Sequence, residues 1–320
     1  MKFTLLPLCL LLFLINGCSK DAKPTKEWSL VADGITAAAL NESHALLATI
    51  DQGGQWWQLQ PKRLLHTFRH GSTQQQDLVS VAVTPDGQFA LTADREGIAW
   101  WHTPGGKPLA SWSLPGIQTV KLSTDGQWAL IGLTDRAVYF YLKSGKTRFA
   151  FPHERNVKTV SLDRKGRFAL TGGDDGQAKL WDLTSGTLVH HWNHRGKLAN
   201  VTLSPRGTYA VTNALLGPIR IWDTRSGKLK HELNPDFITV TSAAFSNKEG
   251  YLATGHPSQG IKLWSVRKGR LLREFKTRRS LWRPNASPVL ALEFSPRIRY
   301  LLSATSDGRV QKWRMKGKNK

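Results

Sequence analysis

Short apolar runs separated by turn residues recur seven times between residues 38 and 314. The copy at residues 160–182 shows the pattern most clearly. It holds an apolar run, a turn, a second run that begins at Phe168, a turn at Asp175-Gly176, and a third run that closes on Trp181. Short runs of β-branched and aromatic residues bounded by Gly, Asp and Ser are typical of β-strands. Each copy therefore predicts three strands joined by tight turns.

The copies repeat with a nearly constant period. The residues aligned with Phe168 are Ala45, Phe89, Trp128, Phe168, Tyr209, Tyr251 and Tyr300, and their spacings are 44, 39, 40, 41, 42 and 49. A period of about 40–45 residues with strand chemistry is typical of the blades of a β-propeller. We therefore expect an all-β fold with seven blades. Such a ring supports many functions, so the fold alone does not name a partner.

Each blade needs a fourth, outer strand. Segments that follow the third run supply it, for example residues 186–192, 227–233 and 269–275. No such segment follows Trp313, whereas residues 27–32 have strand character and precede the first copy. We expect this N-terminal segment to pair with the last blade and close the ring, because closure removes exposed sheet edges.

The copies resemble WD40 repeats, and the third run ends in a literal Trp-Asp pair at Trp181-Asp182 and Trp222-Asp223. The resemblance implies that a polar relay of four side chains holds each blade together. Its places are a His before the first strand, a Ser or Thr, an Asp in a turn, and the Trp. The residues at these places in the clearest copy are His153, Thr171, Asp175 and Trp181. Such a network rigidifies a blade because it satisfies buried polar groups.

The other copies depart from this relay. The Trp place holds Gln58, His102 and Tyr141 in the first three copies. The fifth copy has His194, Thr212 and Trp222, with Leu216 at the Asp place; the last has Ser303, Asp307 and Trp313 but no His. One complete relay in seven predicts a divergent member whose stability depends mainly on apolar packing.

Residues 1–17 have the composition of an export signal. Lys2 provides the positive start, and residues 5–15 form an apolar run too short to span a bilayer. A short N-terminal core helix is the alternative, but polar residues follow the run at once.

The sequence Ile15-Asn16-Gly17-Cys18 resembles the lipobox of bacterial lipoproteins, although Asn16 replaces the usual Ala or Ser. The resemblance implies cleavage before Cys18 and its acylation by more than one chain, which gives stable anchoring.

We therefore expect four parts: a signal peptide at 1–17, a lipidated Cys and tether at 18–26, the propeller at 27–315, and a basic tail at 316–320. Cys9 lies in the leader, so no intramolecular disulfide is expected after cleavage. Ser19 follows the acylated residue where an Asp would imply inner-membrane retention. In a host with two membranes, the resemblance thus implies the outer membrane, facing the periplasm.

The chain is strongly basic, with 45 Lys and Arg against 23 acidic residues and a net charge of +22. Two sets of turns hold many of these cations. The turns between first and second strands carry Arg164, Lys165, Arg167, Arg206, Lys248, Arg297 and Arg299, and those before the outer strand carry Lys143, Lys146, Arg225, Lys228, Arg267, Lys268 and Arg270. Both sets should lie on one face of a propeller, which predicts a basic face.

Three interpretations of this face stay open: a solvated surface, attraction to anionic lipid headgroups, or contact with an acidic protein or polyanionic envelope component. Nucleic acid would suit the charge but not the compartment, so it is not expected.

A second candidate is the loop in the longest spacing, where cations flank a Trp: Lys276, Arg278, Arg279, Trp282 and Arg283. Aromatic residues and Arg are enriched in binding hot spots. The alternative is a solvated loop whose Trp282 packs onto a blade.

The sequence shows little catalytic chemistry. His190, His191 and His194 are close in sequence, but alternation along a strand sends the first two to opposite sides, so no metal site is expected. No HExxH, CxxC or GxSxG motif and no glycine-rich phosphate loop occurs, and no cofactor is expected. We expect a non-catalytic scaffold that binds envelope proteins. The alternative is an envelope hydrolase or lyase with its site at the mouth of the propeller channel.

Overall fold

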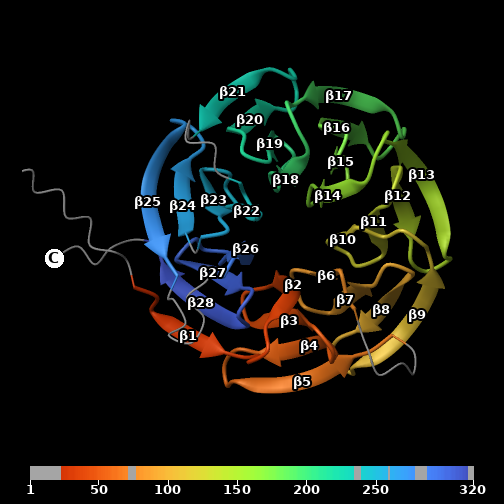
Figure 1. Cartoon of the computed structure of the whole chain (residues 1–320), viewed down its shortest axis with the longest axis vertical. Helices are drawn as coiled ribbons and strands as arrows, with labels where there is room; N and C mark the ends of the chain where they lie inside the picture. The colour runs from red at the N-terminus through yellow and green to blue at the C-terminus, as the bar shows by residue number, and fades with distance from the viewer. Residues whose placement is uncertain (1–22, 71–76, 234–238, 259, 278–286, 316–320) are drawn as a thin grey trace, which may run out of the picture.

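A ring of β-sheets makes up the protein (Figure 1). The computed structural model describes residues 23–70, 77–233, 239–258, 260–277 and 287–315, in which 28 strands form seven four-stranded antiparallel sheets. The predicted all-β, seven-bladed propeller is therefore confirmed. No helix in the described part of the chain has the length and apolarity needed to cross a membrane.

The strands of each blade follow one another outward from the ring centre. Blade 1 has β2 (Ile35–Leu40), β3 (His44–Thr49), β4 (Gly53–Gln58) and β5 (Arg63–Phe68), and blade 2 has β6 (Ser80–Val83), β7 (Phe89–Ala93), β8 (Gly97–His102) and β9 (Lys107–Ser113). Blade 3 has β10 (Thr119–Leu122), β11 (Trp128–Gly132), β12 (Arg136–Tyr141) and β13 (Lys146–Pro152), and blade 4 has β14 (Val157–Leu162), β15 (Phe168–Gly173), β16 (Gln177–Asp182) and β17 (Leu188–Asn193). Blade 5 has β18 (Leu198–Leu203), β19 (Tyr209–Ala214), β20 (Ile219–Asp223) and β21 (Leu229–Leu233), and blade 6 has β22 (Ser242–Phe245), β23 (Tyr251–Gly255), β24 (Gly260–Ser265) and β25 (Arg270–Lys276). Blade 7 combines β26 (Val289–Phe294), β27 (Tyr300–Thr305) and β28 (Arg309–Arg314) with the N-terminal β1 (Lys26–Ser29).

The N-terminal strand closes the ring, as predicted. β1 pairs antiparallel with β28, and the register places Lys26 opposite Lys312 and Ser29 opposite Arg309. Trp28 is buried, and the backbone N–H of Leu30 donates to the carbonyl of Gly308 at 3.0 Å. Blade 7 thus obtains its outer strand from the other end of the chain, and its sheet has no open outer edge at β28.

The hydrophobic core is divided among the interfaces between blades. Seven clusters of buried side chains each join two neighbouring blades. In β15, Ala169 packs toward blade 3 and Leu170 packs toward blade 5, because successive strand residues point to opposite sides of a sheet. Trp28 and Leu30 share a cluster with Ala45 of blade 1, so the closure also seals an apolar interface.

The strand register corrects three sequence alignments. Phe168 lies opposite Asp182 and Ala169 opposite Trp181 in blade 4. The residue equivalent to Phe168 in blade 1 is His44, which lies opposite Gln58, and not Ala45. The Trp place is consequently filled by Trp57, Trp101 and Phe140, each one residue before the residues expected from sequence. The hairpins of blades 2 and 3 are one residue shorter than that of blade 4, which hid this shift.

Candidate functional site

Three features of the ring could serve a function: the polar relays within blades, the central channel, and the charged faces.

The blade 4 relay is assembled completely. His153 Nδ1 lies 2.8 Å from Asp175 Oδ2 and His153 Nε2 lies 2.8 Å from Thr171 Oγ1. The indole N–H of Trp181 donates to the same Thr171 hydroxyl at 3.0 Å. The side chains of His153 and Asp175 are at most 1% exposed. Burial lowers the pKa of His153, although Asp175 opposes that shift.

A second complete relay lies in blade 2, where the sequence analysis placed none. His70 Nδ1 lies 2.9 Å from Asp94 Oδ2 and its Nε2 lies 2.7 Å from Thr92 Oγ1. The indole of Trp101 donates to Thr92 at 2.8 Å. The expectation of one relay in seven is therefore wrong. The signal was present in the Trp100-Trp101 pair, but aligning His102 with Trp181 obscured it.

The remaining blades keep only parts of the relay. Trp222 donates to Thr212 at 2.8 Å, but His194 does not bond to Thr212; its Nδ1 lies 3.5 Å from Arg220 Nη1. Its buried Nε2 has no partner among the described residues. In blade 7, Trp313 donates to Ser303 at 2.9 Å, whereas Asp307 accepts from Thr305 at 2.6 Å. His194 and Asp307 are therefore not relay members, contrary to the sequence alignment.

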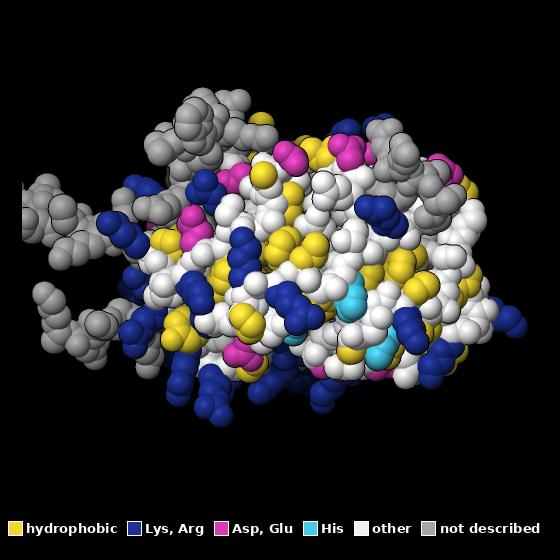
Figure 2. Space-filling model, turned by 90° about the horizontal axis from the view of Figure 1, so that it is seen from below, with side chains coloured by type: hydrophobic (Ala, Val, Ile, Leu, Met, Phe, Trp, Pro, Cys, Tyr) yellow, Lys and Arg dark blue, Asp and Glu magenta, His cyan; other side chains and the backbone are white. Residues whose placement is uncertain are grey.

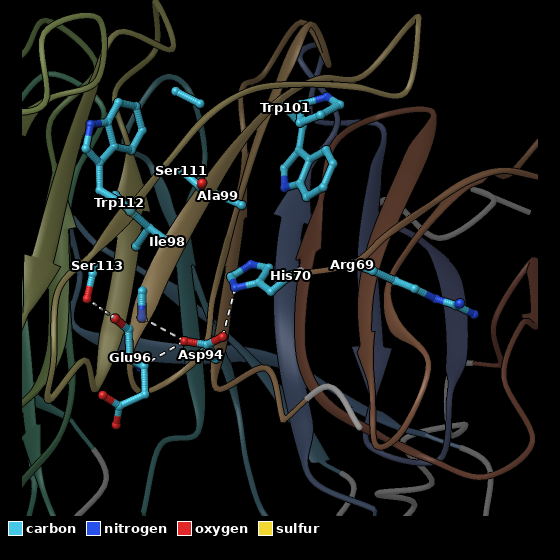
Figure 3. Close-up of a pocket in the computed structure, with 13 residues that line it drawn as sticks. Arg69, His70, Asp94, Glu96, Ile98, Ala99, Trp101, Ser111, Trp112 and Ser113 are labelled. Atoms are coloured by element: carbon cyan, nitrogen blue, oxygen red, sulfur yellow. Dashed lines mark hydrogen bonds and ion pairs between the residues drawn. The ribbon is translucent and has the colours of Figure 1, made fainter. Parts of the chain in front are cut away.

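The blade 2 relay borders a pocket of about 430 Å³ on the outer side of the ring (Figure 3). His70 and Asp94 face it and are 14% and 30% exposed, unlike their buried counterparts in blade 4. The pocket also holds Glu96, Trp101 and Trp112. Both ring nitrogens of His70 are engaged by Asp94 and Thr92. The pair thus resembles a catalytic dyad in composition, yet its geometry is that of a blade relay.

The central channel, of about 420 Å³, is lined by the innermost strands of all seven blades. Its charged lining residues are Lys121, Lys158 and Glu293. Burial raises the pKa of Glu293 to about 7, although Arg164 and Lys121 act against the rise, and burial lowers the pKa of Lys121. The Lys121 side chain is exposed and lines the channel, which the innermost strands of the seven blades surround.

The channel offers no recognisable catalytic set. None of its lining residues in the described chain is a His or Cys, and no hydrogen bond among these described residues joins a hydroxyl to Lys121, Lys158 or Glu293. Lys158 instead donates to the side-chain oxygen of Gln118 at 2.5 Å. No group of three His, Cys, Asp or Glu side chains in the described residues is arranged to hold a metal ion.

The charged turns lie as the sequence predicted. Because each sheet is an antiparallel meander, the turns between first and second strands and those before the outer strand share one face, which we call the basic face. Neighbouring turns on it are bonded: Thr124 Oγ1 donates to the carbonyl of Arg164 at 3.0 Å, and the N–H of Arg164 donates to the carbonyl of Pro205 at 3.1 Å. In the edge-on view of Figure 2, Lys and Arg side chains project along the lower rim, which is this face.

The candidate partner-binding loop begins on the opposite face. Lys276 ends β25, whose C-terminal end points to that face. Arg278, Arg279, Trp282 and Arg283 lie outside the described residues, as does Cys18. The structure therefore gives no side-chain geometry for the lipidation site or for most of this loop.

Comparisons with known proteins agree with the architecture. Residues 145–182 and 276–314, which belong mainly to blades 4 and 7, match the WD40 family, described as "WD domain, G-beta repeat". The chain is similar to telomerase protein component 1 of Rattus norvegicus, with 30% identity over 46% of this chain and 6% of that protein. It is also similar to the human angio-associated migratory cell protein, with 28% identity over 49% of this chain and 37% of that protein.

A third relative is the periodic tryptophan protein 2 homolog of Dictyostelium discoideum, with 27% identity over 71% of this chain and 24% of that protein. The chain thus matches well under half the length of each of these three relatives. This protein is a seven-bladed β-propeller, and two of its segments match the WD40 repeat.

Proposed function

We propose that this protein is a non-catalytic interaction platform of the bacterial cell envelope, held by a lipid on Cys18 at the outer membrane and facing the periplasm. The observation that carries the proposal is the closed ring with a strongly basic face. Seven sheets locked by β1 form a rigid body, and a rigid body presents binding groups at low entropic cost. The general role of WD40 propellers as scaffolds supports the same interpretation.

The anchor rests on the lipobox resemblance around Cys18. Residues 19–26 would form the tether, and eight extended residues reach at most about 29 Å. The ring would therefore stay close to the lipid. A platform in that position would gather envelope proteins beside the membrane, and it would need no cofactor.

The partner surface that we propose is the segment after Lys276, with Arg278, Arg279, Trp282 and Arg283. Lys276 places its start on the face opposite the basic face. A partner bound there would not compete with contacts that the basic face makes. The two faces would then serve separate roles.

Metabolic labelling tests the anchor. Radiolabelled palmitate should enter the wild-type chain but not Cys18→Ser, and the labelled protein should fractionate with outer membranes. Label in both proteins would contradict the lipobox interpretation.

Crosslinking in intact cells tests the platform. Trp282→Ala combined with Arg278→Gln and Arg279→Gln should abolish crosslinked adducts of the anchored protein. The matched control is Arg155→Gln with Arg195→Gln, which removes two exposed cations from the face opposite the basic face, where the loop after Lys276 begins. Adducts that survive the first variant, or disappear equally in both, would contradict the proposed loop.

A further inference from the structure

The basic face and its opposite differ sharply in charge. All fourteen Lys and Arg residues predicted for the basic face are exposed. The opposite face is mixed in charge: its turns carry the exposed acidic residues Asp33, Asp51, Asp77, Glu96, Asp135 and Glu154 and the exposed cations Arg69, Arg95, Arg155, Arg195 and Lys197. The ring is therefore electrically polar along its axis, and Figure 2 shows acidic side chains near its upper rim.

The turns of the basic face hold fewer acidic residues than cations: Glu42, Asp86 and Asp125 are exposed, whereas Asp163 and Glu249 serve the fold. Asp163 is buried and accepts hydrogen bonds from the backbone N–H groups of Arg167 and Phe168 at 2.6 and 3.0 Å. Glu249 is also buried and accepts from the backbone N–H of Arg206 at 2.6 Å. Among the fourteen cations, the described contacts include one ion pair, between Arg167 and Asp163. Most of the positive charge thus points to solvent unpaired.

A rim of exposed aliphatic side chains borders these cations. Each lies at the start of an outer strand, within three residues of a turn on the basic face. The members are Leu64, Leu109, Leu188, Leu229 and Leu271, which are 39–46% exposed. Single exposed Leu residues need no explanation. Four of these residues share one register position, because Leu64, Leu188, Leu229 and Leu271 each lie opposite the Trp place of their blade. In blade 2 that position is Pro108, and Leu109 follows it. All five side chains approach the perimeter of one charged face.

The chain also enters the ring from the side of this face. β28 ends at Arg314 on the basic face, and β1 begins opposite Lys312, only two residues away. The Thr25 hydroxyl donates to the carbonyl of Lys312 at 2.9 Å. β1 therefore starts where the turn before the outer strand lies in the other blades. A tether that precedes Lys26 would leave the ring toward the surface that the basic face meets.

We propose that the basic face docks flat on an anionic lipid bilayer, with its cations at the headgroups and the leucine rim at the edge of the acyl region. This inference deepens the proposed function by naming the surface beneath the ring, and it rests on that function only for the direction of the tether. Cations attract anionic membranes, and apolar side chains that reach the interface add binding. Protein interfaces concentrate their apolar anchors at the centre, whereas in this ring they lie around the edge.

Vesicle sedimentation tests the docking without the anchor. Residues 23–320 contain every strand of the closed ring and lack Cys18. This fragment should bind vesicles of phosphatidylethanolamine and phosphatidylglycerol but not vesicles of phosphatidylcholine. Each cation near an anionic surface strengthens binding about fivefold. Lys143→Gln, Lys146→Gln, Arg225→Gln and Lys228→Gln together should therefore weaken binding at least about tenfold.

The matched control removes four exposed cations from the opposite face: Arg69→Gln, Arg95→Gln, Arg155→Gln and Arg195→Gln. Its binding should stay within about twofold of the wild type, because these groups face away from the lipid. Thermal melts of both variants check that the ring is intact. Equal losses in both variants would show attraction by net charge alone and overturn the docked orientation.

Two further outcomes bear on the lipid and on the rim. If the wild-type fragment does not bind anionic vesicles, the proposal is overturned, and an acidic protein becomes the expected partner of the basic face. This outcome is independent of palmitate labelling at Cys18. At raised salt, where exposed charges are screened, Leu188→Asn with Leu271→Asn should remove the remaining binding. Residual binding unchanged by these substitutions would contradict the role of the rim.

Discussion

The indole nitrogen of Trp101 lies 2.8 Å from the hydroxyl oxygen of Thr92, and this bond anchors a relay that continues to His70 and Asp94. The neighbouring Trp100 is also buried, yet its indole nitrogen has no partner in the described structure. Two adjacent indoles thus differ in one interaction. That difference makes the contribution of the relay measurable.

Trp101→Phe should lower the free energy of unfolding more than Trp100→Phe. Both substitutions remove similar volume, but only the first removes a buried hydrogen bond. That bond contributes about 0.5–1.5 kcal/mol, since the Thr92 hydroxyl keeps its contact with His70. Urea denaturation of the two variants measures the difference. Equal losses would mean that the relay adds nothing beyond packing.

Trp28→Ala should loosen the ring closure. The Trp28 side chain is 5% exposed and packs in the cluster that joins blades 7 and 1. Removing a buried Trp side chain costs about 3–5 kcal/mol. We expect a fall of several degrees in melting temperature, whereas Lys26→Ala, in an exposed position on the same strand, should change it little. Deletion of residues 27–32 should have a larger effect still. An unchanged melt for Trp28→Ala would contradict the closure.

His194 should make the protein less stable in mild acid. Burial, with Arg220 nearby, lowers the pKa of His194 to about 4, below the value of about 6.5 in an unfolded chain. The unfolded state therefore binds the proton more readily below pH 6.5, so stability falls as the pH drops from about 6.5 to about 4. The contribution of this residue at pH 4.5 is at most about 2–3 kcal/mol.

His194→Phe should accordingly reduce the loss of stability between pH 7 and pH 4.5. Urea denaturation at the two pH values measures it. His191→Asn provides the control, because His191 lies on the exposed side of the same outer strand region. If His194→Phe keeps the full wild-type pH dependence, the buried imidazole is not its source.

Glu293→Gln should stabilise the ring at alkaline pH. Burial in the channel raises the pKa of Glu293 to about 7, above its ordinary value of 4.5. The protonated form is therefore favoured by folding, and that contribution is lost as the pH rises through about 7. At pH 8.5 the substitution should gain about 1–2 kcal/mol, since water in the channel moderates the full shift. At pH 4.5 the variant and the wild type should have the same melting temperature. If Glu293→Gln is less stable than the wild type at pH 8.5, a raised pKa for Glu293 is contradicted.

The number of blades and the closing strand could be predicted from the sequence, because both depend on short-range patterns. Alternating apolar runs and turn glycines define strands locally, and a period near 40 residues counts the blades. The blade 4 relay was also visible, since its hairpin keeps the spacing between Thr171 and Trp181. The two sets of basic turns followed from the meander, in which alternate turns must share a face.

Tertiary structure alone decided the features that depend on register and on contacts between blades. The shorter hairpin of blade 2 moves the Trp place to Trp101, and only the pairing of Ala90 with Trp101 reveals this. His194 keeps its sequence position but points to Arg220, because side-chain direction depends on packing that spacing does not encode. The burial of Asp163 and Glu249 leaves their cationic neighbours to face solvent, and it follows from hydrogen bonds within and between turns that no local pattern specifies. A sequence can fix which residues form strands, but the relative placement of side chains is set by the packing of whole blades against one another.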